Sequence, residues 1–99
     1  MVITIIAIIN VKEGKMEEAI EQLKTIVPHV LNSEPGCLAY IPHVLKGSKN
    51  KNKILFYEKY KDKEAFNVHN TNLPKNIAPL QPFLEPGMEI FQCTEILED

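Results

Sequence analysis

Apolar residues run almost without interruption from Val2 to Val11, and most of them are β-branched. This pattern is typical of a strand that is buried on both faces. The run is only about half as long as the roughly 20 residues that span a bilayer. No basic residue precedes it and no small-residue cleavage site follows it, so we expect a buried strand and neither a membrane span nor a secretion signal.

The spacing of apolar positions changes after the turn at Lys12–Gly14. From Met16 to Leu31 they recur three or four residues apart, which predicts an amphipathic helix that ends at Ser33–Gly36. Pro28 removes one backbone hydrogen bond from this helix, so we expect a kink or a restart there.

Four further elements are predicted: a strand over Cys37–Leu45, a strand over Ile54–Tyr60, a helix over Lys63–Thr71 and a last strand over Met88–Leu97. Pro42 indicates that the first of these strands lies at an edge, and Asp62 is a good N-cap for the helix. The segment from Leu73 to Leu84 contains three prolines, which permit only a short, interrupted helix or a turn. The sequence does not determine the path of this segment.

The resulting order, β-α-β-β-α-β, predicts an α+β fold of the ferredoxin-like, split-βαβ type, with a four-stranded antiparallel sheet and both helices on one face. The 99 residues indicate a single domain, residues 1–99, because chains divide into separate cores only above about 250 residues.

Two helices can cover only one face of such a sheet, yet the strand over Val2–Val11 and the stretch Ile54–Tyr57 of the third strand are apolar on both faces. An uncovered second face would expose more apolar surface than monomers usually do. Packing of two sheets face to face would cover it, so we expect a homodimer. The sequence does not decide whether dimers form larger assemblies.

The composition limits the kinds of binding partner that can be expected. The net charge of −2, with 24% charged residues, gives no basic excess that would attract nucleic acid or an anionic membrane. The two cysteines, Cys37 and Cys93, fall in strands predicted at opposite edges of the sheet, so we expect free thiols and a cytoplasmic protein.

Glu58 and His69 are the residues that could carry chemistry. His69 lies about 10 Å along its helix, and a strand covers that distance in about three residues, which returns to the level of Tyr57 and Glu58. The two side chains meet only if the face that bears Glu58 is turned towards the helices, which the sequence leaves undecided. A polar pair that merely closes a core is the alternative, and Tyr40, Tyr57 and Tyr60 have the same structural alternative.

Other chemistry is not indicated. There is no phosphate-binding glycine loop and no nucleophile elbow. Three scattered histidines do not predict a metal site. Of these, His29 and His43 are expected at the surface.

Four stretches, "VKEGKMEEAIEQL", "SEPGCLAYIPHV", "YEKYKDKEAFNVHN" and "EIFQCTEIL", resemble the antibiotic-biosynthesis-monooxygenase family of dimeric α+β barrels, and most closely its quinol-monooxygenase branch. The resemblance implies a homodimer with a pocket between sheet and helices. It also implies oxidation of a small quinol or polyphenol by O2, with no bound metal, flavin or other cofactor. His69 would be the base or the orienting group and Glu58 its partner. The substrate-binding residues would be Tyr57, Tyr60, Phe66 and Leu73.

Two alternatives remain beside this monooxygenase or oxidase. One is an isomerase of a small phosphorylated carbonyl compound, which the lysine-rich loop "KGSKNKNK" favours slightly. The other is a non-catalytic dimeric protein that binds small molecules, because Leu73 and Pro74 stand where many relatives carry a second histidine. Haem degradation is disfavoured, since Ala7 and Pro79 stand where that branch has its asparagine and its haem ligand.

Overall fold

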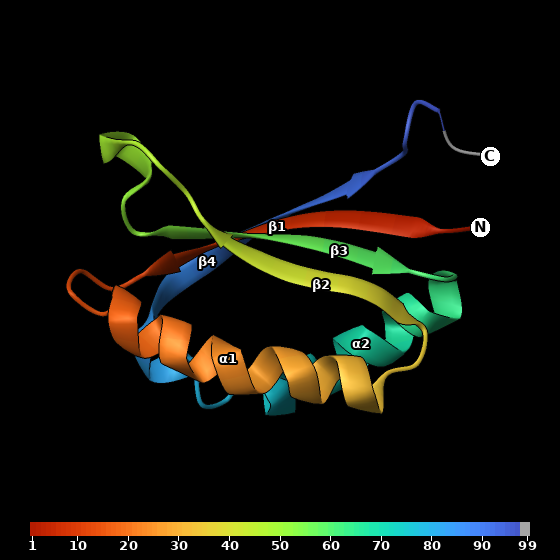
Figure 1. Ribbon diagram of the computed structural model, residues 1–99, viewed down its shortest axis with the longest axis horizontal. Helices are drawn as coiled ribbons and strands as arrows, with labels where there is room; N and C mark the ends of the chain where they lie inside the picture. The colour runs from red at the N-terminus through yellow and green to blue at the C-terminus, as the bar shows by residue number, and fades with distance from the viewer. Residues whose placement is uncertain (98–99) are drawn as a thin grey trace.

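The computed structural model describes residues 1–97 and contains the predicted order of elements (Figure 1). They are β1 (Ile3–Val11), α1 (Met16–Ser33), β2 (Cys37–Val44), β3 (Lys53–Tyr60), α2 (Lys63–Asn76) and β4 (Leu84–Cys93), with short 3-10 turns at Ser48–Asn50 and Gln81–Phe83. The strands form one antiparallel sheet in the order β2-β3-β1-β4, and both helices lie on the same face of it. The predicted ferredoxin-like fold is confirmed.

The register of the two central strands decides which side chains face the helices. Ile5 of β1 lies opposite Glu58 of β3, and Ala7 lies opposite Phe56. These residues are buried, whereas their neighbours Leu55 and Tyr57 are only half-buried. The face of β3 that bears Glu58 is therefore the one that meets the helices.

Helix α1 supplies much of the core. Its buried residues are Ala19, Leu23, Ile26 and Val30, which repeat at the helical period. The helix continues through Pro28 as a single element, so the expected restart is not found. Pro28 is exposed, and water can therefore hydrate the carbonyl that its missing N–H leaves without a partner. Within residues 1–97 neither helix is long and apolar enough to cross a membrane.

Helix α2 begins as predicted but ends later. The carboxylate of Asp62 accepts a hydrogen bond from the backbone N–H of Ala65 at 2.8 Å, which is the expected N-cap. The helix then runs past Thr71 and through Pro74 to Asn76. The predicted end was wrong because Pro74 falls in the last turn, where the one lost hydrogen bond concerns the carbonyl of the exposed Asn70.

Strand β4 begins at Leu84, before the predicted start at Met88. Ile9 pairs with Met88 and Val11 pairs with Leu84, so the stretch 85–87 lies opposite Asn10 alone. Gly87 has φ +99°, which glycine adopts without strain. Proline and glycine normally end a strand, but at a sheet edge an irregular bulge accommodates both.

The sheet face opposite the helices is apolar across its middle and has no covering element within residues 1–97 (Figure 1). Ile6 lies between Tyr57 and Phe91 on this face. Ile41 of β2 and Phe91 of β4 keep 47% and 51% of their surface exposed. We call this the outer face.

The turn that joins α1 to β2 packs closely against α2. A Cβ atom added to Gly36 would overlap the Cβ of Ala65. The backbone N–H of Lys61 also donates to the carbonyl of Gly36 at 2.9 Å, which fixes the turn beside the start of α2. Only glycine fits this approach.

We therefore expect Gly36→Ala to lower the free energy of unfolding by about 1–3 kcal/mol, because the added methyl group must displace α2. The double variant Gly36→Ala/Ala65→Gly should recover part of this loss by removing the opposing methyl. Urea unfolding at one fixed protein concentration measures both values. Equal stability of Gly36→Ala and the native protein would contradict the close packing.

Candidate active site

His69 occupies the face of α2 that is turned to the sheet. Its side chain is 2% exposed and packs against two aromatic rings. The ring centroids of Tyr40 and Tyr60 are each 5.1 Å from that of the imidazole. These contacts restrict the movement of the ring.

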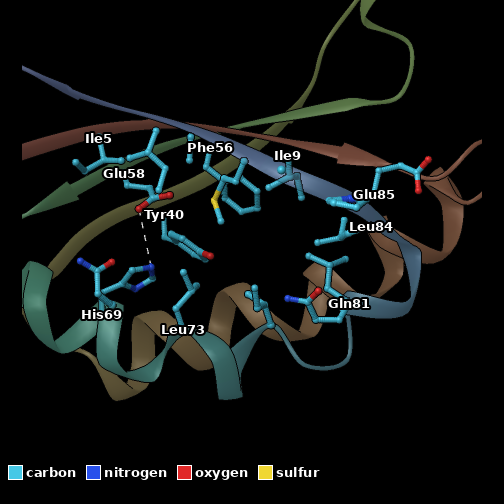
Figure 2. Close-up of a pocket in the computed structure, with 18 of the residues that line it drawn as sticks. Ile5, Ile9, Tyr40, Phe56, Glu58, His69, Leu73, Gln81, Leu84 and Glu85 are labelled. Carbon is cyan, nitrogen blue, oxygen red and sulfur yellow. Dashed lines mark ion pairs between the residues drawn. The ribbon is translucent and has the colours of Figure 1, made fainter.

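Glu58 approaches this imidazole from β3, as the distance estimate from the sequence predicts (Figure 2). The Oε1 atom lies 3.9 Å from Nε2 of His69, which is too far for a hydrogen bond but close enough for electrostatic coupling. The hydroxyl of Tyr60 donates a hydrogen bond of 2.6 Å to the same Oε1 atom. The Nε2 atom thus faces Glu58 without being bonded to it.

A second carboxylate holds the other nitrogen of the ring. Oε1 of Glu34 lies 2.9 Å from Nδ1 of His69. Its Oε2 atom accepts a hydrogen bond from the Nδ2 amide of Asn76 at 3.2 Å. Glu34 is 2% exposed, so this pair is removed from water.

These side chains stand at one end of a cavity of about 210 Å³ between the sheet and the helices (Figure 2). Most of its lining is apolar and comes from β1, β3, α2 and β4. The polar groups at its surface are Glu58, His69, Asn70, Gln81, Glu85 and the hydroxyl of Tyr40. Pockets for drug-sized ligands measure about 300–1,000 Å³, so this one suits a smaller molecule with one or two rings.

The predicted binding residues separate into three groups. Phe66 and Leu73 line the cavity as expected. Tyr60 is buried behind Glu58 and supports it without lining the cavity. The expectation for Tyr57 was wrong, because its position on β3 directs it to the outer face, away from the cavity.

Sequence reasoning missed Tyr40 and Glu34 as site residues. Tyr40 lies opposite Glu58 in the pairing of β2 with β3, so the correct register of these strands would have placed it in the cavity. Glu34 is the C-cap residue of α1. A carboxylate is unfavourable at the C-terminal end of a helix dipole. This unfavourable position was the one feature of the sequence that could have indicated a functional role for Glu34.

Burial controls the protonation of the site. It raises the pKa of Glu58, partly offset by the hydrogen bond from Tyr60 and the proximity of His69. Burial, reinforced by the charge of Glu58, also raises the pKa of the hydroxyls of Tyr40 and Tyr60. Both tyrosines therefore stay protonated at neutral pH, and the hydroxyl of Tyr60 donates to Glu58.

Other reactive groups lie elsewhere or are inert. Burial raises the pKa of the Cys37 thiol to about 11, so it is a poor nucleophile at neutral pH. Cys37 and Cys93 are both free thiols. His29 and His43 are exposed, and neither lines the cavity. Within residues 1–97 no group of three or more histidine, cysteine or acidic side chains is arranged to hold a metal ion.

The ferredoxin-like sheet, with His69 and Glu58 at one end of a mainly apolar cavity, places the protein among small α+β proteins with a pocket between sheet and helices. The family model for antibiotic biosynthesis monooxygenases matches residues 2–73. The chain belongs to this family.

Solved structures agree in fold. A candidate antibiotic biosynthesis monooxygenase from Caulobacter crescentus has a TM-score of 0.81 at 20% identity, covering 96% of this chain and 90% of that one. A conserved protein from Methanosarcina mazei gives 0.77 at 22% identity, with coverage of 94% and 91%. A protein from Shewanella oneidensis gives 0.70 at 25% identity, with coverage of 93% and 90%. A search of curated proteins found no match.

The raised pKa of Glu58 makes stability depend on pH. In the unfolded chain this carboxyl titrates near its ordinary value of 4.5, whereas in the folded protein it holds its proton to higher pH. Its contribution to stability is complete below pH 4.5 and is lost as the pH rises through the folded pKa. We expect Glu58→Gln, which stays neutral and can still accept from Tyr60, to gain stability relative to the native protein over that interval. Urea midpoints at pH 4 and pH 8 test this; a constant difference between the two proteins would contradict it.

Proposed function

We propose that the protein oxidises a small phenolic or quinol substrate with O2, with His69 as the base, as in the quinol-monooxygenase branch that the sequence resembles. The observation that carries the proposal is the Nε2 atom of a buried histidine at the end of a small, mainly apolar cavity. Both His69 and Glu58 line the cavity, so a ligand hydroxyl in the cavity could lie beside them and donate its proton to Nε2.

The chemistry needs a proton acceptor and a dry, oriented site. Transfer of the hydroxyl proton to Nε2 of His69 gives a phenolate, which is rich enough in electrons to reduce O2. In the oxidase form, two electrons and two protons pass from a hydroquinone to O2 and yield a quinone and hydrogen peroxide. In the monooxygenase form, one oxygen atom enters the ring to give a hydroxyquinone and the other leaves as water. The electrons come from the substrate, so the proposed reaction requires no resident metal or flavin.

The charges of the cavity favour a neutral substrate over a phosphorylated one. Its lining carries the carboxyl groups of Glu58 and Glu85, and no lysine or arginine is among the lining residues in the part of the chain that the structure describes. The lysine-rich loop from Lys46 to Lys53 does not line the cavity either. A phosphate group would enter the cavity without a compensating cation. Burying such an unpaired charge costs roughly several kcal/mol. This argues against the isomerase of a phosphorylated carbonyl compound.

We expect His69→Ala to lower the rate of O2 uptake with hydroquinone by about 10²–10⁴-fold, because the general base is lost. An oxygen electrode, corrected for autoxidation without enzyme, measures this. His43→Ala is the matched control, since that exposed imidazole lies outside the cavity. It should keep the native rate.

Three outcomes would contradict the proposal. A native rate of O2 uptake in His69→Ala would show that His69 is not the base. Turnover of the same substrate under argon would indicate proton transfer without oxidation. Tight binding of quinols without any O2 uptake would favour a binding protein.

We also propose that two copies pair through their outer faces. The support is the row of apolar residues across the middle of this face, Ile41, Tyr57, Ile6 and Phe91, which the helices leave uncovered. Face-to-face packing of the two sheets would complete a dimeric α+β barrel, and each cavity would lie on the far side of its own sheet.

A lysine on the outer face should therefore produce a monomer. We expect Ile41→Lys to halve the mass measured by light scattering after gel filtration, because burying an unpaired charge opposes association. Leu31→Lys is the matched control: Leu31 is exposed to a similar degree, 41% against 47%, but lies on α1. A native mass for Ile41→Lys, or dissociation by Leu31→Lys, would place the interface elsewhere.

A further inference from the structure

We infer that Glu34 is the positioning residue of this site: it keeps the proton of His69 on Nδ1 and so presents the Nε2 lone pair to the cavity. The inference concerns the imidazole itself, and only its kinetic consequence rests on the proposed oxidation. Its basis is the 2.9 Å contact between Oε1 of Glu34 and Nδ1, made where both side chains are 2% exposed.

The proton in this contact belongs to the imidazole. An ionised carboxylate can only accept hydrogen bonds, whereas an imidazole nitrogen can carry a proton, so we assign Glu34 as the acceptor and Nδ1–H as the donor. The arrangement around Glu34 agrees, because its other oxygen accepts from the amide of Asn76. A neutral imidazole carries only one N–H. A proton held on Nδ1 therefore leaves Nε2 free to accept one.

Glu58 does not compete for this role. Its Oε1 atom is 3.9 Å from Nε2, outside hydrogen-bond range, and is already occupied by the hydroxyl of Tyr60 at 2.6 Å. Glu34 thus makes the hydrogen bond to the ring, and Glu58 lines the cavity beside Nε2 without bonding to it.

The fold holds Glu34 in place through its backbone. Its N–H donates to the carbonyl of Val30 at 2.9 Å and closes the last turn of α1. Its carbonyl accepts from the N–H of Cys37 at 2.9 Å, where β2 begins. The carboxylate is therefore fixed before any ligand binds, as an orienting group must be.

The carboxylate also acts during proton transfer. When Nε2 accepts a proton, the imidazole becomes a cation in a site with little water. The negative charge of Glu34 is already at hydrogen-bond distance from that cation and lowers the free energy of forming it. Glu34 would then contribute to the rate without touching the substrate, since it is not among the residues that line the cavity.

The first experiment is NMR of the native protein labelled with 15N-histidine at neutral pH. Two-bond correlations between ring protons and ring nitrogens distinguish a protonated nitrogen from one with a free lone pair. We expect His69 to be a single form with its proton on Nδ1, whereas the exposed His29 and His43 should average between forms. A proton on Nε2 of native His69 would overturn the inference without any variant.

Two variants test the cause. In Glu34→Ala the acceptor is gone, and we expect the form protonated on Nε2 to become populated. Glu34→Gln keeps the shape but removes the charge, and its amide can donate as well as accept, so it should also yield a mixture. Persistence of the single Nδ1–H form in every Glu34 variant that folds would overturn the inference.

The kinetic measurement separates positioning from simple structural support. Glu34→Gln should lower kcat for quinol oxidation by about 10–100-fold, the usual effect of losing an orienting partner, and change KM less than twofold. Glu64→Gln, an exposed charge removal on the helix that carries His69, should keep both constants. A rise in KM with kcat unchanged would mean that Glu34 only shapes the pocket. If the native protein oxidises no quinol, the proposed function fails, and the NMR result still decides the role of Glu34.

Discussion

The close packing of the α1–β2 turn against α2 is the constraint on which this site depends. Gly36 has no side chain, so the turn can touch Ala65 directly. Ala65 precedes His69 by four residues and lies on the same face of α2. Glu34 sits at the beginning of that turn. A larger residue at position 36 would separate the two elements and lengthen the contact between Nδ1 and its carboxylate.

The site also collects ionisable groups where a core would normally be apolar. Two carboxyl groups, an imidazole and a tyrosine hydroxyl lie within hydrogen-bond or electrostatic range of one another, and all four side chains are buried. Removing such groups from water is costly unless each has a partner. Within residues 1–97 every fully buried side-chain nitrogen and oxygen has a hydrogen-bond partner, which keeps that cost limited. A purely apolar core of the same shape would be simpler to build. The satisfied hydrogen bonds explain how the fold tolerates this polar cluster, and the proposed proton transfer would give it a use.

Most of the fold could be predicted from local patterns in the sequence. The apolar periods located both helices and all four strands, and their order led to the correct topology. The approach of His69 to Glu58 also followed from helix and strand geometry, although the face of β3 became known only from its pairing with β1. Glu34 could not be derived in this way. Its contact with His69 joins a turn to a helix 35 residues further along, and no periodicity encodes such a distance.

Proline and glycine accounted for two of the errors in element boundaries. They indicated the end of α2 and the start of β4, yet α2 continues through Pro74 and β4 already includes Pro86–Gly87. A further error is unrelated to them: β4 ends at Cys93, before the predicted end at Leu97. Both prolines lie where a missing backbone hydrogen bond has little consequence, in the last turn of a helix and on an edge strand. Such tolerance is set by tertiary position, which single-sequence reasoning does not include. Tyr57 was misplaced for a related reason, since the side of the strand depends on pairing.

The irregular stretch of β4 has a consequence for how this scaffold can diverge. Residues 85–87 form part of the cavity wall, yet they lie opposite a single residue of β1, and regular pairing resumes on either side of them. Insertions or deletions there would reshape one end of the chamber while leaving the strands that carry Glu58 and Tyr40 in register. The shape of the cavity could thus change at this edge alone, while the end that holds Glu58 and His69 keeps its geometry.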